Sequence, residues 1–279
     1  KNVLFFGGLL IAAALEAVRA HERIALKTLL LFGMQPCRLL LGFMAATAFL
    51  SMWMNNTATC AMMMPIADAV LSHLSTSAAR VGGATSNPAA GGVDEVVARA
   101  SSTLAPPLPD RCDRESAQDG TEQLEGLGKA LALGVAWSAN IGGMATLTGT
   151  GPNIVLAGQF NSLYPAAPAL SFASWTVYAA PIAIATLAVA HSLLCARFLA
   201  RSAEGLYDVE ATTRLIHAQH SSLGPPTYRE AAVLADFVVL ATLWVTRSPG
   251  FMPGWGVLFG DRVTDATSAI AMALLLFAL

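Results

Sequence analysis

Two clusters of neutral hydrogen-bonding residues interrupt long apolar parts of this chain. The first, SMWMNNTATC (51–60), lies in a run from Leu39 to Ala67 that holds no charged residue. The second, TLTGTGPN (146–153), lies in the uncharged run 130–196. Hydroxyl, amide and carbonyl oxygens with no acid or base nearby suit an alkali cation, and the free N–H groups at a helix start suit an anion. The two clusters therefore predict a binding site for small ions.

A packing role is the alternative for each cluster. Serine and threonine in membrane helices often bond their own backbone or a neighbouring helix, and a single asparagine is more often packing than ligand. Two adjacent asparagines flanked by threonine, together with a second break rich in glycine and threonine, favour ligand binding. The role of Asp236 stays open, because an acid inside a predicted span is either functional or placed to reach the membrane interface.

The composition indicates a membrane protein. Apolar residues make up 55% of the chain and charged residues 12%, whereas a soluble domain carries about 25% charged residues. The uncharged run 130–196 is long enough for two crossings of about 20 residues each. We therefore predict an all-α polytopic membrane protein in contact with the lipid bilayer and without a nucleic-acid partner. Because the common hydrolase, nucleotide and metal-site motifs are absent, we do not expect an enzyme.

The same patterns divide the chain into segments. A re-entrant helical hairpin is expected because the limb 39–53 is short for a crossing, and Pro65 and Asp68 interrupt the second limb. Non-helical backbone inside a membrane survives only within protein or beside a water-filled cavity, so the second cluster predicts a broken transmembrane helix. The predicted segments are a partial transmembrane helix plus an interfacial helix (1–38), the re-entrant hairpin (39–74), a disordered cytoplasmic loop (75–125), the broken helix and a following transmembrane helix (126–196), a cytoplasmic arm (197–229) and transmembrane helices of which the last is truncated (230–279).

Lysine and arginine predict the orientation. They concentrate in 19–38, 80–114 and 197–229, whereas the turn at 164–170 carries no charge. Placing the three basic segments in the cytoplasm requires 39–74 to enter and leave on one face, which independently supports the hairpin. The chain begins at a lysine and stops inside an apolar run, so we expect it to be an internal piece of a longer protein.

Several motifs resemble one family of transporters. LLLGFMAATAFLSMWMNNTATCAMMMPIADAVL (39–71) is similar to the first hairpin of the divalent anion–sodium symporter family, the sodium-coupled citrate and dicarboxylate transporters, and SANIGGMATLTGTGPNIVLAGQFNSLYP (138–165) is similar to its broken fifth helix. Shorter matches follow at FASWTVYAAP (172–181), LGPPTYREAAVL (223–234) and PGFMPGWG (249–256). The resemblance implies two inverted repeats, of which this chain holds mainly the first. It also implies an elevator-type transporter that works as a homodimer, and we expect it in the plasma membrane.

The resemblance also implies roles for individual residues. Asn56 and Thr57 match the family's Ser-Asn-Thr motif and would contact a substrate carboxylate. The family usually has serine where this chain has Asn55. The change is tolerable if this position contributes its backbone carbonyl, but if the serine hydroxyl is needed, sodium affinity falls or the Asn55 amide replaces that ligand. The implied sodium ligands are Ser51, Asn55, Asn56, Thr150 and Gly151, and the implied loop-shaping residues are Gly149, Pro152 and Asn153.

The implied activity is sodium-coupled symport of a di- or tricarboxylate such as citrate or succinate. Since the second repeat is missing, this chain would supply half of the binding site and would not transport alone. Sodium–sulfate symport is the alternative within the same family. A membrane channel with a re-entrant filter is the alternative from another class. A membrane-embedded enzyme ranks third, because no nucleophile–base or metal constellation is present.

Overall fold

The computed structural model describes residues 2–33, 35–83, 111–199, 209–248 and 253–277 of the chain. Every regular element in these ranges is helical, which confirms the all-α prediction. The elements in chain order are α1 (Asn2–Ala17), α2 (Ala20–Phe32), α3 (Pro36–Ser51), α4 (Asn56–Gly83), α6 (Arg111–Ala145), α7 (Gly151–Leu163), α8 (Phe172–Leu194), the π-helical turn η1 (Cys195–Leu199), α9 (Val209–Ser222), α10 (Tyr228–Arg247), the 3-10 helix η2 (Trp255–Arg262) and α11 (Asp265–Leu276).

Helices α3 and α4 flank the first polar cluster. Pro36 opens α3, where its missing N–H would have no helical partner in any case. Helix α4 continues to Gly83 and α6 begins at Arg111. The segment 75–125, expected to be a disordered loop, is therefore helical at both ends, because its alanine, arginine, glutamate and glutamine are strong helix formers despite their polarity. The rest of that segment, 84–110, lies outside the described residues.

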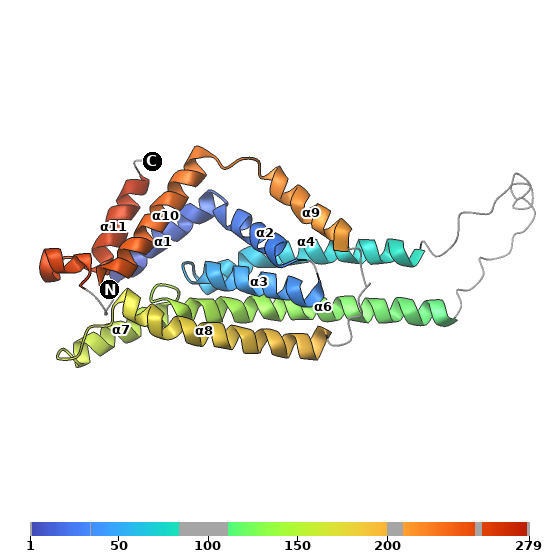
Figure 1. Cartoon of the computed structure of the whole chain (residues 1–279), viewed down its shortest axis with the longest axis horizontal. Helices are drawn as coiled ribbons and strands as arrows, with labels where there is room; N and C mark the ends of the chain where they lie inside the picture. Colours follow the sequence, from blue (N-terminus) through green and yellow to red (C-terminus); the bar gives the residue numbers. More distant parts are fainter. Residues whose placement is uncertain (1, 34, 84–110, 200–208, 249–252, 278–279) are drawn as a thin grey trace, which may run out of the picture.

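The helices form two packed groups, which are visible in Figure 1. In the hairpin group, α3, α4 and α8 all pack against the long helix α6. In the α10 group, α1, α10 and α11 pack against one another. Helix α2 follows α1 and packs on α3, while α9 lies between α8 and α10 in the sequence and packs on α2. Helices α2 and α9 therefore connect the two groups.

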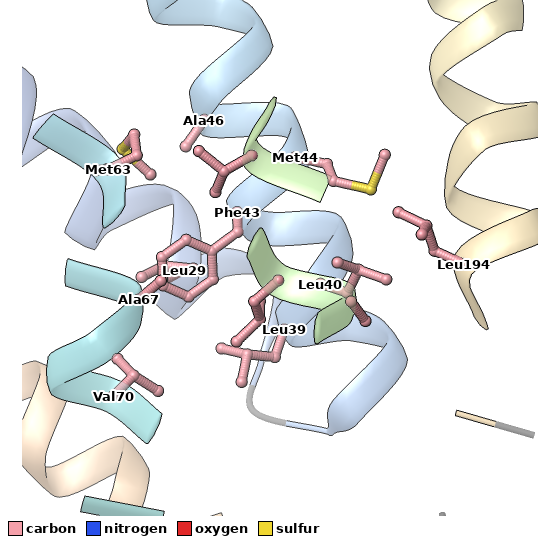
Figure 2. Close-up of a cluster of buried hydrophobic side chains, with 14 of the residues drawn as sticks. Leu29, Leu39, Leu40, Phe43, Met44, Ala46, Met63, Ala67, Val70 and Leu194 are labelled. Atoms are coloured by element: carbon pink, nitrogen blue, oxygen red, sulfur yellow. The ribbon is translucent and has the colours of Figure 1, made fainter. Parts of the chain in front are cut away.

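The core of the hairpin group surrounds α3. Figure 2 places the ring of Phe43 next to Leu29 of α2 and Ala67 of α4. From another side of α3, Met44 points toward Leu194 of α8. All of these side chains are buried. A helix that is covered on several sides needs apolar residues around most of its circumference, which explains why this stretch lacks the one-sided pattern of a surface helix.

One helix in the described part of the chain, Phe172–Leu199, is long and apolar enough to cross a membrane. Shorter apolar helices cover Phe6–Ala17, Pro36–Ser51 and Asp265–Leu276. On the long helix, Val177, Tyr178 and Ile184 are 68%, 75% and 69% exposed. A row of large, exposed apolar side chains indicates a surface that contacts lipid or another protein.

A largely buried ion pair ties α2 to the start of α10. Arg23 Nε donates to Glu230 Oε1 over 2.5 Å, and Arg23 Nη2 donates to Glu230 Oε2 over 3.2 Å. The same guanidinium donates to the carbonyls of Leu223 and Gly224, which follow α9. The two charged side chains are only 12% and 6% exposed. Arg23 therefore holds three segments together at one point, with the bidentate geometry that makes such pairs strong.

Arg23→Met is expected to destabilise the protein by about 3–5 kcal/mol, because it leaves the Glu230 carboxylate buried without its cation. Thermal unfolding of the detergent-solubilised protein measures the change. Arg19→Met is the matched control, since Arg19 pairs with Glu22 while 67% exposed, and an exposed pair contributes about 0–1 kcal/mol. Equal small shifts in the two variants would show that Arg23 does not hold α2 against α10.

Candidate ion and substrate site

The turn between α3 and α4 is held by Asn55. Its Oδ1 accepts a hydrogen bond from the Thr57 N–H over 3.0 Å. Its backbone carbonyl accepts from the Thr59 N–H over 2.9 Å and from the Thr59 hydroxyl over 3.0 Å. Asparagine is favoured immediately before a helix because its side chain satisfies an N–H of the first turn. The polar residues of the first cluster thus make the start of α4 possible.

Ser51 and Asn56 fix this turn against α6. Ser51 Oγ lies 2.6 Å from the Ala139 carbonyl and 2.8 Å from Asn56 Oδ1, so its hydrogen is shared between two acceptors. Asn56 Nδ2 donates to Asn140 Oδ1 over 3.1 Å, and Asn140 Nδ2 donates to the Ala136 carbonyl over 2.9 Å. This chain of bonds sets the orientation of the Asn56 amide.

Side chains satisfy the backbone where α6 breaks before α7. Thr146 Oγ1 donates to the Met52 carbonyl in the α3–α4 turn and accepts from the Gly149 N–H over 3.1 Å. Asn153 Nδ2 donates to the carbonyls of Gly143 and Thr146 over 3.0 and 2.8 Å. The last carbonyls of a helix have no partner within it. Asn153 therefore makes the break in α6 stable at a buried position.

Glycines on α6 and in the α6–α7 break allow close approaches to α3, to Asn56 and within the break itself. A Cβ at Gly142 would lie 2.1 Å from the Ala48 backbone oxygen. A Cβ at Gly143 would lie 2.3 Å from Asn56 Oδ1. A Cβ at Gly149 would lie 2.5 Å from the Gly143 oxygen. A larger residue at any of these positions would force these segments apart.

A cavity of about 70 Å³ lies between the α3–α4 turn, the α6–α7 break and α1. Its lining carries no charge and consists of Gly8, Leu9, Trp53, Asn55, Thr148, Gly149, Thr150 and Gly151. Thr148 Oγ1 is buried and has no hydrogen-bond partner among the described residues. Leaving such a group unsatisfied costs about 1–3 kcal/mol. The cavity therefore offers neutral oxygens to a small cation, and one of its lining residues, Thr148, has a buried hydroxyl without a partner among the described residues.

Four helix ends meet at this site. Helices α3 and α6 end here at Ser51 and Ala145, and their terminal carbonyls carry partial negative charge that favours a cation. Helices α4 and α7 start here at Asn56 and Gly151, and their N-termini favour an anion. The arrangement can hold a cation next to an anion without any charged side chain.

The structure brings part of the predicted sodium set together. Asn55, Thr150 and Gly151 line the cavity. Ser51 and Asn56 are bonded to each other and to α6 beside the turn, but they do not line the cavity. The ligand roles of all five residues stay predictions.

The remaining predicted residues lie around the same site. Thr57 is exposed in the first turn of α4, where it is available to a ligand. Gly149 lines the cavity, and Pro152 is exposed in the first turn of α7. Asn153 is buried and bonded across the break. The contact of Thr57 with substrate and the loop-shaping roles of the other three remain predictions.

Trp53, Thr146 and Thr148 lie within the two predicted clusters but were given no role of their own, whereas Asn140 and the cavity residues Gly8 and Leu9 lie outside both clusters and were missed. Trp53 stacks on Phe172 with ring centroids 6.1 Å apart and meets the edge of Phe237 at 4.9 Å, so it joins the turn to the α10 group. Asn140 is a polar residue in an uncharged run, which is the signal that could have found it. Nothing in the sequence pattern indicates that Trp53 lines the cavity.

The fold and the site have features that are typical of one class of membrane protein. Polar breaks at the start of half-helices, combined with a long exposed apolar helix, are the recurring plan of helical membrane transporters. The chain belongs to the family described as the sodium:sulfate symporter transmembrane region, whose model matches residues 1–279. It is therefore a membrane protein.

Individual members of this family are similar to the chain over nearly its whole length. The chain is 41% identical over 300 residues to solute carrier family 13 member 2 of Oryctolagus cuniculus. It is 38% identical over 295 residues to the Na(+)/citrate cotransporter of Rattus norvegicus and 36% identical over 311 residues to the Na(+)/dicarboxylate cotransporter 3 of the same organism. Each match covers 99% of this chain and 50% of the relative. The chain thus spans about half the length of these relatives, and the predicted resemblance is confirmed.

Proposed function

We propose that the protein to which this chain contributes is a sodium-coupled symporter of di- and tricarboxylates such as citrate or succinate. The observation that carries the proposal is the uncharged cavity between the α3–α4 turn and the α6–α7 break, bordered by helix ends of both polarities. Similar chains named for the cotransport of sodium with citrate or with dicarboxylates support it. Transport of this kind needs no covalent step.

Sodium is a cargo ion in this proposal and binds through neutral oxygens. Asn55, Thr150 and Gly151 line the cavity, and the free hydroxyl of Thr148 adds a further oxygen. We place Ser51 and Asn56 in the same ligand set, because the hydrogen bond between them borders the turn. Sodium bound here orders the turn and creates the anion site at Asn56 and Thr57. A bound ligand shifts a conformational equilibrium only through such a difference in affinity.

The larger architecture is part of the same proposal. The hairpin group would carry the site past the α10 group as an elevator, with α3 and α4 forming a re-entrant hairpin. The exposed apolar side chains of α8 would face lipid, in a homodimer of the plasma membrane with 75–125 and 197–229 in the cytoplasm. The division of the helices into two groups joined by α2 and α9 supports this assignment.

Sulfate is the second candidate substrate because the family description names it. Uptake of labelled citrate by the full-length protein, in competition with unlabelled succinate or sulfate, distinguishes the two. We expect succinate to compete and sulfate to leave uptake unchanged. Competition by sulfate alone would reverse the assignment. Sodium current without any anion substrate would favour the channel alternative instead.

Thr148→Val is expected to raise the sodium concentration for half-maximal uptake by about tenfold, since the loss of about 1.4 kcal/mol of oxygen–cation interaction corresponds to that factor. Valine keeps the shape of threonine, so the fold should be retained. Thr47→Val is the matched control, because the Thr47 hydroxyl is buried in α3 and donates to the Phe43 carbonyl away from the cavity. An unchanged sodium dependence in Thr148→Val would remove this hydroxyl from the sodium site.

Thr57→Ala is expected to weaken carboxylate binding by about tenfold while changing the sodium dependence less, because a hydrogen bond to a charged group contributes about 1.5–3 kcal/mol. The half-saturating concentrations of citrate and of sodium, measured on the same preparation, separate the two effects. Thr76→Ala, an exposed threonine farther along α4, is the control. Equal and mild changes in both constants would assign Thr57 to packing.

A further inference from the structure

Two cysteines from distant parts of the sequence lie near each other at one end of the hairpin group. Cys37 lies in the first turn of α3 and is exposed, whereas Cys195 follows α8 directly and is partly buried. Both are free thiols, and both residues contact the ring of His191. Sodium coupling and carboxylate binding make no use of this pair.

His191 contacts both cysteines. Its Nε2 lies 3.0 Å from the Cys37 backbone oxygen and 3.4 Å from Cys195 Sγ. A backbone carbonyl can only accept, so the contact with Cys37 places the hydrogen on Nε2. The same nitrogen lies next to the sulfur of Cys195, so a single ring contacts both residues.

The packing beneath the thiols keeps them together. Leu194, the neighbour of Cys195, points toward Met44 of α3 in Figure 2, and both side chains are buried. Leu40 of α3 belongs to the same cluster and lies one turn after Cys37. The start of α3 and the end of α8 are therefore held by a shared core, which keeps Cys37 and Cys195 near each other.

We propose that Cys37 and Cys195 form a redox-active dithiol, a modification site at which a peroxide reversibly cross-links the start of α3 to the end of α8. Cys37 is the exposed member and meets the oxidant first. Its thiolate attacks one peroxide oxygen, the O–O bond breaks, and the departing hydroxide takes up a proton to leave as water. The product at Cys37 is a sulfenic acid.

Cys195 then completes the bond. Its sulfur attacks the sulfur of Cys37, and the sulfenic hydroxyl leaves as water with the proton of the Cys195 thiol. The two thiols lose two electrons, and the peroxide is reduced to two waters. A small thiol such as glutathione reverses the reaction by thiol–disulfide exchange. The bond would link the start of α3 covalently to the end of α8.

Peptide mapping of the full-length protein tests the proposal. Membranes are exposed to graded hydrogen peroxide, free thiols are alkylated, and the protein is digested without reduction for mass spectrometry. We expect a linked Cys37–Cys195 peptide that disappears after treatment with dithiothreitol. Cys60 is the internal control, since it is also partly buried and its Sγ faces the Val135 carbonyl at 4.0 Å. It should remain open to alkylation once the protein is unfolded.

Two variants test the roles of Cys195 and His191 separately. Cys195→Ser should leave the sulfenic acid at Cys37 without a resolving thiol, so that dimedone labels Cys37 after peroxide treatment. His191→Ala should slow formation of the linked peptide several-fold without preventing it. The proposal would be overturned by alkylation of Cys37 and Cys195 as separate thiols at every peroxide dose. Cross-links to Cys60 at the same rate would overturn it equally.

Discussion

Gly142→Ala is expected to abolish uptake and to leave little folded protein in the membrane. Helix α6 passes α3 so closely that a Cβ at this position would lie 2.1 Å from the Ala48 backbone oxygen. Backbone atoms on both sides cannot rotate away as a flexible side chain could. Overpacking a well-packed interior typically costs about 1–3 kcal/mol, and a clash between two backbones lies at or above the upper end. Surface abundance and the thermal unfolding midpoint measure the loss.

Gly128→Ala on the same helix is the matched control. A Cβ at Gly128 would lie 3.5 Å from Leu71 Cδ1, which is an ordinary contact. Alanine favours a helix by about 1 kcal/mol over glycine, so this variant should be as stable as the parent or more stable. If both variants fold equally well, α6 does not pack against α3 as closely as the structure places it.

Asn153→Ala is expected to remove most uptake while reducing stability less than Gly142→Ala. The Asn153 amide donates to the carbonyls of Gly143 and Thr146, which have lost their helical partners at the break. Each buried carbonyl left unsatisfied costs about 1–3 kcal/mol. The break between α6 and α7 would relax to recover these bonds, and the oxygens of the cavity would lose their arrangement. Initial uptake rates at saturating sodium measure the effect.

Gln159→Ala provides the comparison within α7. Gln159 is an exposed amide on the same helix, so its loss should leave uptake unchanged. A variant Asn153→Gln keeps the amide but lengthens the side chain, and we expect it to recover little activity because the site is buried. Uptake in Asn153→Ala equal to that in Gln159→Ala would show that the amide does not shape the site.

The position of the site could be predicted from the sequence because polar residues are costly in an apolar run. Asn55, Asn56 and the stretch 146–153 stand out for that reason, and the structure places Asn55 and the α6–α7 break around one cavity. The helical class followed from the composition. Both inferences rest on local signals that can be read along the chain.

The contacts that build the site could not be predicted, because they join residues far apart in the sequence. Thr146 reaches the Met52 carbonyl, and Asn140 bonds Asn56 from another helix. The polar composition of 75–125 also led to the prediction of a disordered loop over the whole segment. At its two ends, polar residues with high helix propensity instead extend α4 and α6. Hydrophilicity alone does not distinguish an exposed helix from a loop.

We propose that sodium and a carboxylate bind to one site and move together. Uptake of labelled citrate by the full-length protein, with external sodium replaced by choline, tests it most directly. We expect uptake to fall to the level of cells that lack the protein and to return when sodium is restored. Uptake that persisted in choline would contradict sodium coupling.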